Sequence, residues 1–115
     1  LGLWLLAFAL WLADLWAQQS ILESGGGLRE PGDSVLLSCQ AFGFRFEISG
    51  VRWYRQKPGG SLEWISIISS DSSVIQFAQP LEGRANVSRD NSQFVSSLSI
   101  WALQPRDSAR YFCVV

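Results

Sequence analysis

The chain has 115 residues, of which 48% are hydrophobic and 17% charged, and its formal net charge is −1. These values describe one globular domain rather than a disordered or collagen-like chain. A nearly neutral chain lacks the basic surface that binds nucleic acid or anionic lipid, so we expect neither as a partner. The sequence has no histidine and only two cysteines. This excludes histidine-dependent catalysis and cysteine- or histidine-based metal sites, and we expect no metal or other cofactor.

An apolar run covers residues 1–12 and ends before Asp14. A helix that crosses a bilayer needs about 20 apolar residues, so this run is too short. A short apolar stretch followed by small residues is typical of a secretory signal peptide. We expect residues 1–17 to be such a peptide, truncated at its start, and residues 18–115 to be the mature domain. The alternative is a buried N-terminal helix.

The two cysteines, Cys39 and Cys113, enclose most of the expected mature chain. Secretion would place them in an oxidising compartment, where a disulfide forms and persists. A disulfide that closes so long a loop is worth about 4 kcal/mol on a chain-entropy estimate. We therefore expect the two cysteines to be bonded. The alternative is a pair of unrelated buried thiols.

The hydrophobic pattern after residue 18 has a period of two, which is typical of strands with one buried face. Segments rich in turn-forming residues separate the apolar stretches. Strands are expected at 35–40, 51–54, 62–68, 85–88, 98–100 and 109–115. No segment before Gln104 has the period of a helix. The sequence therefore predicts an all-β sandwich or barrel.

Cys39, Trp53 and Cys113 have the Cys…Trp…Cys spacing of immunoglobulin domains, and Tyr111 has the position of the tyrosine corner. Further similar stretches lie at 23–28, 37–39, 43–46, 62–64, 88–92 and 107–113. On these residues the chain resembles an immunoglobulin heavy-chain variable segment. The resemblance implies a V-type, two-sheet Greek-key sandwich with Trp53 and Tyr111 in its core. It also implies that a chain ending at Val115 lacks the final strand of such a domain.

The resemblance further implies two binding surfaces and a salt bridge between Arg84 and Asp107. The loops expected to bind antigen contain Arg45, Glu47, Ile48, Ser49, Gly50, Arg52, Ser69, Ser70, Asp71, Ser72 and Ser73. The face expected to pair with a light-chain variable domain contains Tyr54, Gln56, Leu62, Trp64 and Phe112. Any membrane attachment would come from an anchor further along the chain. The implied function is antigen binding without catalysis.

Some positions depart from the heavy-chain pattern. Residues 53–59 are closer to a light chain or a T-cell receptor chain, Ala85 stands where a phenylalanine is usual, and Ser96 occupies an inward position that is usually apolar. A T-cell receptor variable domain therefore remains an alternative. So does an adhesion module of the same fold that never rearranges.

Other motifs that suggest chemistry have simpler interpretations. The glycine run 25–27 lacks the Lys-Ser/Thr of a phosphate loop and predicts a bend in the first strand. Asp71 is interpreted as a turn residue at a loop tip. The carboxylates of Glu82 and Asp107 are interpreted as surface charges rather than as a catalytic acid and base. We therefore expect no enzyme. The tripeptide 86–88 is an N-glycosylation sequon. Since Asn86 alternates with inward neighbours, we expect its side chain to face solvent.

Overall fold

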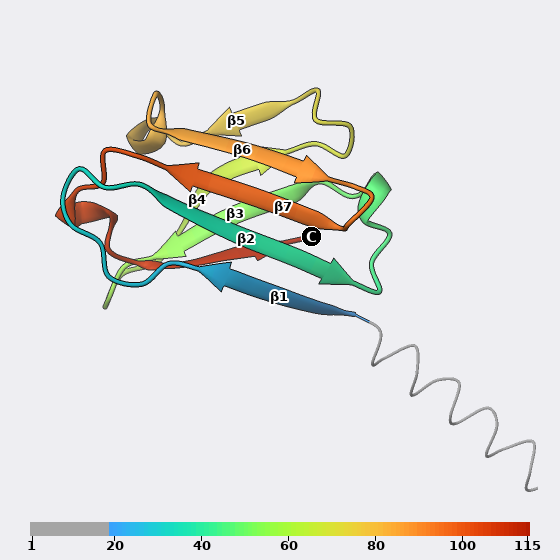
Figure 1. The fold of residues 1–115 in the computed structure, drawn as a ribbon, viewed down its shortest axis with the longest axis horizontal. Coiled ribbons are helices and arrows are strands. Elements are labelled where there is room, and N and C mark those ends of the chain that lie inside the picture. Colours follow the sequence, from blue (N-terminus) through green and yellow to red (C-terminus); the bar gives the residue numbers. More distant parts are fainter. Residues whose placement is uncertain (1–18) are drawn as a thin grey trace, which may run out of the picture.

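The computed structural model describes residues 19–115 (Figure 1), so the expected signal peptide lies outside the described residues. Short strands and single turns of 3-10 helix follow one another along the chain. They are β1 (Ser20–Gly25), β2 (Val35–Phe42), η1 (Phe46–Ile48), β3 (Val51–Gln56), β4 (Leu62–Ile68), β5 (Ile75–Phe77), η2 (Gln79–Leu81), β6 (Ala85–Asp90), β7 (Val95–Ile100), η3 (Pro105–Asp107) and β8 (Arg110–Val114).

The strands form two antiparallel four-stranded sheets with the orders β1-β2-β7-β6 and β5-β4-β3-β8. The sheets pack face to face as two layers (Figure 1). Each sheet buries one face against the other, which explains the alternating pattern of the sequence. The predicted all-β, V-type sandwich is therefore confirmed. Within the described chain β8 pairs with β3 alone and lies at the edge of its sheet.

The core lies between the two layers, and a disulfide crosses it. Cys39 of β2 and Cys113 of β8 are bonded, with their Cα atoms 6.4 Å apart. The expected disulfide is thus confirmed, and it joins one sheet to the other. Trp53 is only 1% exposed and lies opposite Cys113 in the β3–β8 register. The indole ring and the disulfide therefore belong to the same layer of the core.

Ser96, whose inward position is usually apolar, has a hydrogen-bonding role in this core. Its side chain is fully buried. The hydroxyl accepts a hydrogen bond from the indole Nε1–H of Trp53 at 3.4 Å and donates one to the carbonyl of Ser88 at 2.9 Å. A buried indole N–H without a partner would be costly, and the serine removes that cost.

A register shift divides β4 into two halves. Trp53 is opposite Ser66, but the next residue of β3, Tyr54, is opposite Trp64. Ile65 is therefore an extra residue on β4, which is the arrangement of a β-bulge. Ile65 and Ser66 are consecutive and both buried. The bulge thus lets Trp64 point outward on one side of it while Ser66 points into the core on the other.

Candidate functional site

Three connecting segments meet at one end of the sandwich, at the right in Figure 1. They are residues 43–50 around η1, the β4–β5 hairpin loop 69–74, and the β6–β7 turn 91–94. Arg89 donates hydrogen bonds to the carbonyls of Phe46 and Ser69, at 2.6 and 2.9 Å. Asn91 donates to the carbonyl of Ser70 at 3.0 Å. These contacts hold the segments together as one surface, which we call the loop surface.

Hydrogen bonds to Asp71 organise the hairpin loop. One carboxylate oxygen accepts from the backbone N–H and hydroxyl of Ser73, at 3.0 and 2.6 Å, and from the hydroxyl of Ser69 at 3.0 Å. The bonds from Ser73 come first among the causes that lower the pKa of Asp71 to about 2. The loop is therefore ordered by its own polar groups. Ser72, at its tip with a φ of 66°, remains exposed.

The segment 43–50, which we call the first loop, is held by Phe46, which is fully buried in η1. The hydroxyl of Ser49 donates to the carbonyl of Arg45 at 2.8 Å and closes this turn. Glu47 and Ile48 point outward, and 61% of Ile48 is exposed. Residues 43–50 therefore present charged groups and the aliphatic side chain of Ile48, and the other two segments of the loop surface expose Val74 and Phe94.

Arg52 does not belong to the loop surface, although the resemblance assigned it there. It lies in β3, between Val114 of β8 and Ile67 of β4. Val51 before it is buried and Arg52 is exposed, because successive strand residues face opposite sides of the sheet. The side chain therefore lies on the outer face of the β5-β4-β3-β8 sheet.

That outer face carries a row of aromatic side chains, which we call the aromatic row. Tyr54 of β3 is directly opposite both Trp64 of β4 and Phe112 of β8. The rings of Tyr54 and Phe112 are stacked, with centroids 6.0 Å apart and planes inclined by 21°. All three side chains are partly exposed. The structure thus brings together three residues of the expected partner face.

Other residues of this face surround the aromatic row. Leu62 is 53% exposed and lies opposite Gln56. The side-chain amide of Gln56 donates to the carbonyl of Gly60 at 3.1 Å, which fixes its orientation. Exposed Arg52 and Arg110 lie on β3 and β8. The face therefore has an apolar centre and polar margins, the usual anatomy of a protein interface.

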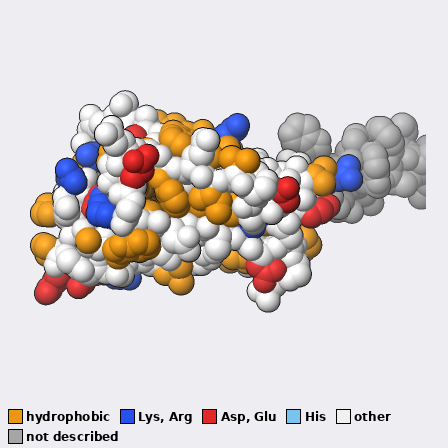
Figure 2. Space-filling view, turned by 90° about the horizontal axis from the view of Figure 1, so that it is seen from above, with side chains coloured by type: hydrophobic (Ala, Val, Ile, Leu, Met, Phe, Trp, Pro, Cys, Tyr) orange, Lys and Arg blue, Asp and Glu red, His pale blue; other side chains and the backbone are white. Residues whose placement is uncertain are grey.

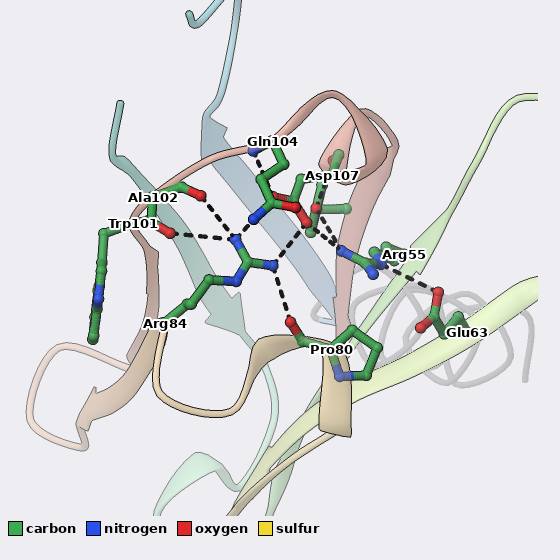
Figure 3. Close-up of polar contacts among 9 residues, drawn as sticks. Arg55, Glu63, Pro80, Arg84, Trp101, Ala102, Gln104 and Asp107 are labelled. Carbon is green, nitrogen blue, oxygen red and sulfur yellow. Dashed lines mark hydrogen bonds and ion pairs between the residues drawn. The ribbon is translucent and has the colours of Figure 1, made fainter. Parts of the chain in front are cut away.

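The opposite end of the sandwich contains an ion-pair cluster (Figure 3). Arg84 pairs with both carboxylate oxygens of Asp107, at 2.9 and 3.0 Å, as the resemblance implied. Arg84 also donates to the carbonyls of Pro80, Trp101 and Ala102. Tyr111 donates its hydroxyl to the carbonyl of Asp107 at 2.7 Å, which is the tyrosine corner.

Sequence reasoning missed Arg55, which completes this cluster. Arg55 is 2% exposed and pairs with Asp107 and Glu63, each at 3.2 Å. The signal was present, because Arg55 has the inward phase of β3 that it shares with Val51 and Trp53. Burial opposes ionisation of Asp107, but hydrogen bonds from Arg84 and from the Gln104 backbone outweigh it and lower the pKa of Asp107.

An open hollow of about 370 Å³ lies beside this cluster, between the 26–31 segment and residues 103–111. Asp107 contributes to its lining, but both carboxylate oxygens of Asp107 are already bonded to arginines.

Within residues 19–115 no group of three metal-ligating side chains occurs. In the same part of the chain no helix is long and apolar enough to cross a bilayer. Charges of both signs are interspersed over the side seen in Figure 2.

A two-sheet antiparallel sandwich with an intersheet disulfide and a tyrosine corner defines an immunoglobulin-type domain. The family model described as "Immunoglobulin V-set domain" matches residues 28–115. The chain therefore belongs to the immunoglobulin V-set domain family.

Proposed function

We propose that this chain is the variable domain of an antigen receptor of the heavy-chain type. It pairs with a light-chain variable domain through the aromatic row and binds antigen, without catalysis, through the loop surface. The observation that carries this proposal is the direct alignment of Trp64, Tyr54 and Phe112 across three strands on an outward face.

The comparison of the two outer faces supports the pairing. The outer face of the β1-β2-β7-β6 sheet has serines at Ser24, Ser38, Ser97 and Ser88. These small polar side chains are well solvated, whereas three adjacent aromatic rings are not. Large apolar groups that gather on one surface mark a binding site for another protein. Tyrosine and tryptophan are also the residues that contribute most to interface hot spots.

The loop surface supports the second part of the proposal. Its frame is fixed by Arg89, Phe46 and Asp71, while Arg45, Glu47, Ile48 and Ser72 point outward. A fixed frame lowers the entropy lost on binding, and exposed polar groups provide adaptable hydrogen bonds. The exposed tips have few aromatic groups, so we expect the pairing partner to supply part of the contact area.

A T-cell receptor variable domain is the second candidate, favoured by the Tyr54-Arg55-Gln56-Lys57-Pro58 stretch. An adhesion module of the same fold would use the same aromatic row with a different partner. For the first two candidates we propose that the chain is secreted or displayed at the plasma membrane as part of a receptor. The disulfide supports this location, because disulfides persist in oxidising compartments.

A pairing experiment tests the proposed function. The chain is produced with a light-chain variable domain, and their dissociation constant is measured for the parent and for Trp64→Ser. Removing an interface hot spot costs about 2 kcal/mol or more, so we expect affinity to fall by at least about tenfold. Thermal unfolding of the isolated variant should change less than its affinity does, because Trp64 is on the surface.

Leu36→Ser is the matched control. Leu36 is 58% exposed, as apolar as the residues of the aromatic row, and lies on the outer face of the other sheet. We expect this variant to pair like the parent. Equal affinities of the parent and Trp64→Ser would refute the pairing. Binding to T-cell receptor partner domains but not to light-chain domains would replace the first candidate with the second.

A further inference from the structure

The chain contains two asparagines, Asn86 and Asn91, and the structure treats them differently. Asn91 is partly buried, and its side chain bonds to Arg89 and to the carbonyl of Ser70. Asn86 is exposed on β6, next to buried Val87. Asn86-Val87-Ser88 is a glycosylation sequon, whereas Asn91 is followed by Ser92 and Gln93 and is not part of one.

We propose that Asn86 carries an N-linked oligosaccharide that lies over the outer face of the β1-β2-β7-β6 sheet. The proposal requires passage through the secretory compartment, but it does not depend on antigen binding. The Cys39–Cys113 disulfide points to the same compartment.

The transfer reaction makes a simple demand on the chain. The side-chain amide nitrogen of Asn86 forms a bond to C1 of the sugar of a lipid-pyrophosphate oligosaccharide. The bond between C1 and the pyrophosphate oxygen breaks, the lipid pyrophosphate leaves, and the amide nitrogen gives up one proton. The hydroxyl residue two positions on, Ser88, completes the recognised tripeptide. Because transfer occurs on the unfolded chain, the fold must afterwards leave the modified side chain outside the core.

The fold meets this demand. β6 is an edge strand that pairs with β7 alone within the described chain, and Asn86 is exposed on it. Directly opposite Asn86 on β7 is Ser99, a small side chain. The adjacent row consists of Ser88, Ser97, Ser38 and Ser24, one on each strand of the sheet. Small side chains leave room for a sugar above the sheet, and their hydroxyls can bond to it.

A glycan at this position would also cover apolar surface. Leu36 of β2 is opposite Ser99, which is opposite Asn86, so the three residues form one row. Neighbouring strands are about 4.8 Å apart, which places Leu36 about 10 Å from Asn86, within the length of a few sugar units. Leu36 is 58% exposed. The same glycan would shield the unpaired edge of β6 against association with another strand.

The position is compatible with both proposed binding surfaces. The aromatic row lies on the outer face of the opposite sheet. Asn86 is near the beginning of β6, after η2, whereas the loop surface is reached at the other end of β6, at Arg89 and Asp90. A glycan at Asn86 therefore projects away from the partner face and from the loop end.

The test uses the full chain, expressed in mammalian cells behind a secretory leader and analysed in medium and lysate. We expect peptide N-glycosidase to increase the gel mobility of the parent, and intact mass to show one oligosaccharide. Asn86→Gln and Ser88→Ala should each migrate like the enzyme-treated parent. The matched controls Asn91→Gln and Ser97→Ala leave the sequon intact and should keep the enzyme-sensitive band.

A single enzyme-insensitive band for the parent in both medium and lysate would overturn the proposal. So would a mobility shift that persists in Asn86→Gln and Ser88→Ala. A second measurement locates the glycan on the sheet. Amide exchange at residues 36 and 99 should be slower in the glycosylated parent than after enzyme treatment, and equal rates would refute the coverage of that face.

Discussion

The guanidinium of Arg89 lies 4.3 Å from the centre of the Phe46 ring and also donates a hydrogen bond to the Phe46 carbonyl. One side chain of β6 thus contacts both the ring and the backbone of the first loop. Its other terminal nitrogen donates to Ser69 in the hairpin loop. Burial lowers the pKa of Arg89, yet a guanidinium remains charged in the physiological range. The charge therefore continues to stabilise the whole loop surface.

Arg89→Lys should weaken this arrangement. Lysine keeps the positive charge but has no planar group to stack on Phe46 while donating in two directions. We expect the free energy of unfolding to fall by about 1–3 kcal/mol. Urea denaturation measures the change, and Arg106→Lys, at an exposed position of η3, is the control. Equal stabilities of the two variants would contradict the proposed role of Arg89.

Ser96→Ala should destabilise the core by about 1–3 kcal/mol, because it leaves the indole N–H of Trp53 without an acceptor. Ser97→Ala is the control, since Ser97 lies next in β7 with the opposite, outward phase. Thermal unfolding monitored by tryptophan fluorescence measures both. If Ser96→Ala unfolds at the same temperature as Ser97→Ala, the hydrogen bond contributes no stability.

Stability should fall in acid because of Asp107. Its folded-state pKa lies below the ordinary value near 3.9, so the unfolded chain binds the proton more readily. The contribution of Asp107 is therefore complete above about pH 5 and is lost as the pH falls through 4 towards the folded-state pKa. Denaturation between pH 7 and pH 3 measures this loss. Asp107→Asn should be less stable at neutral pH and should vary less over this range. If the stability of Asp107→Asn falls as steeply between pH 7 and pH 3 as that of the exposed-site control Glu82→Gln, which keeps Asp107, the prediction is contradicted.

The pKa of Asp71 should be measurable by carboxyl NMR and should lie at about 2. Ser73→Ala removes a hydroxyl bond to the carboxylate, and we expect the pKa to rise. Ser72→Ala is the control, because Ser72 makes no side-chain bond to Asp71 within the described residues. A pKa near the ordinary aspartate value in the parent would show that the hairpin loop is not held by Asp71.

The sandwich was predictable because the alternation of inward apolar and outward polar residues repeats along the chain. Alternation at Val35, Leu37 and Cys39 shows a buried strand face directly, and the Cys39, Trp53 and Cys113 spacing identifies the domain class. The strand β5 was not predicted, since three residues are too few to show a period. The 3-10 turns η1, η2 and η3 are equally short.

The candidate site was only partly predictable. The aromatic row follows from strand phase, because Tyr54 and Phe112 alternate with inward neighbours. The resemblance assigned Arg52 to a binding loop, whereas the structure places it in β3, where strand phase directs its side chain to the outer face of the sheet. The internal bonding of Asp71 and Ser69 depends on loop geometry. No periodic pattern encodes that geometry.

The extra residue Ile65 separates β4 into two halves with different surroundings. On one side of it, Leu62 and Trp64 are aligned with Gln56 and Tyr54, and on the other side the strand leads into the hairpin loop. A change of length in that loop would be absorbed at or beyond the bulge and would leave Trp64 opposite Tyr54. The length of the hairpin loop can therefore change while the aromatic row keeps its geometry.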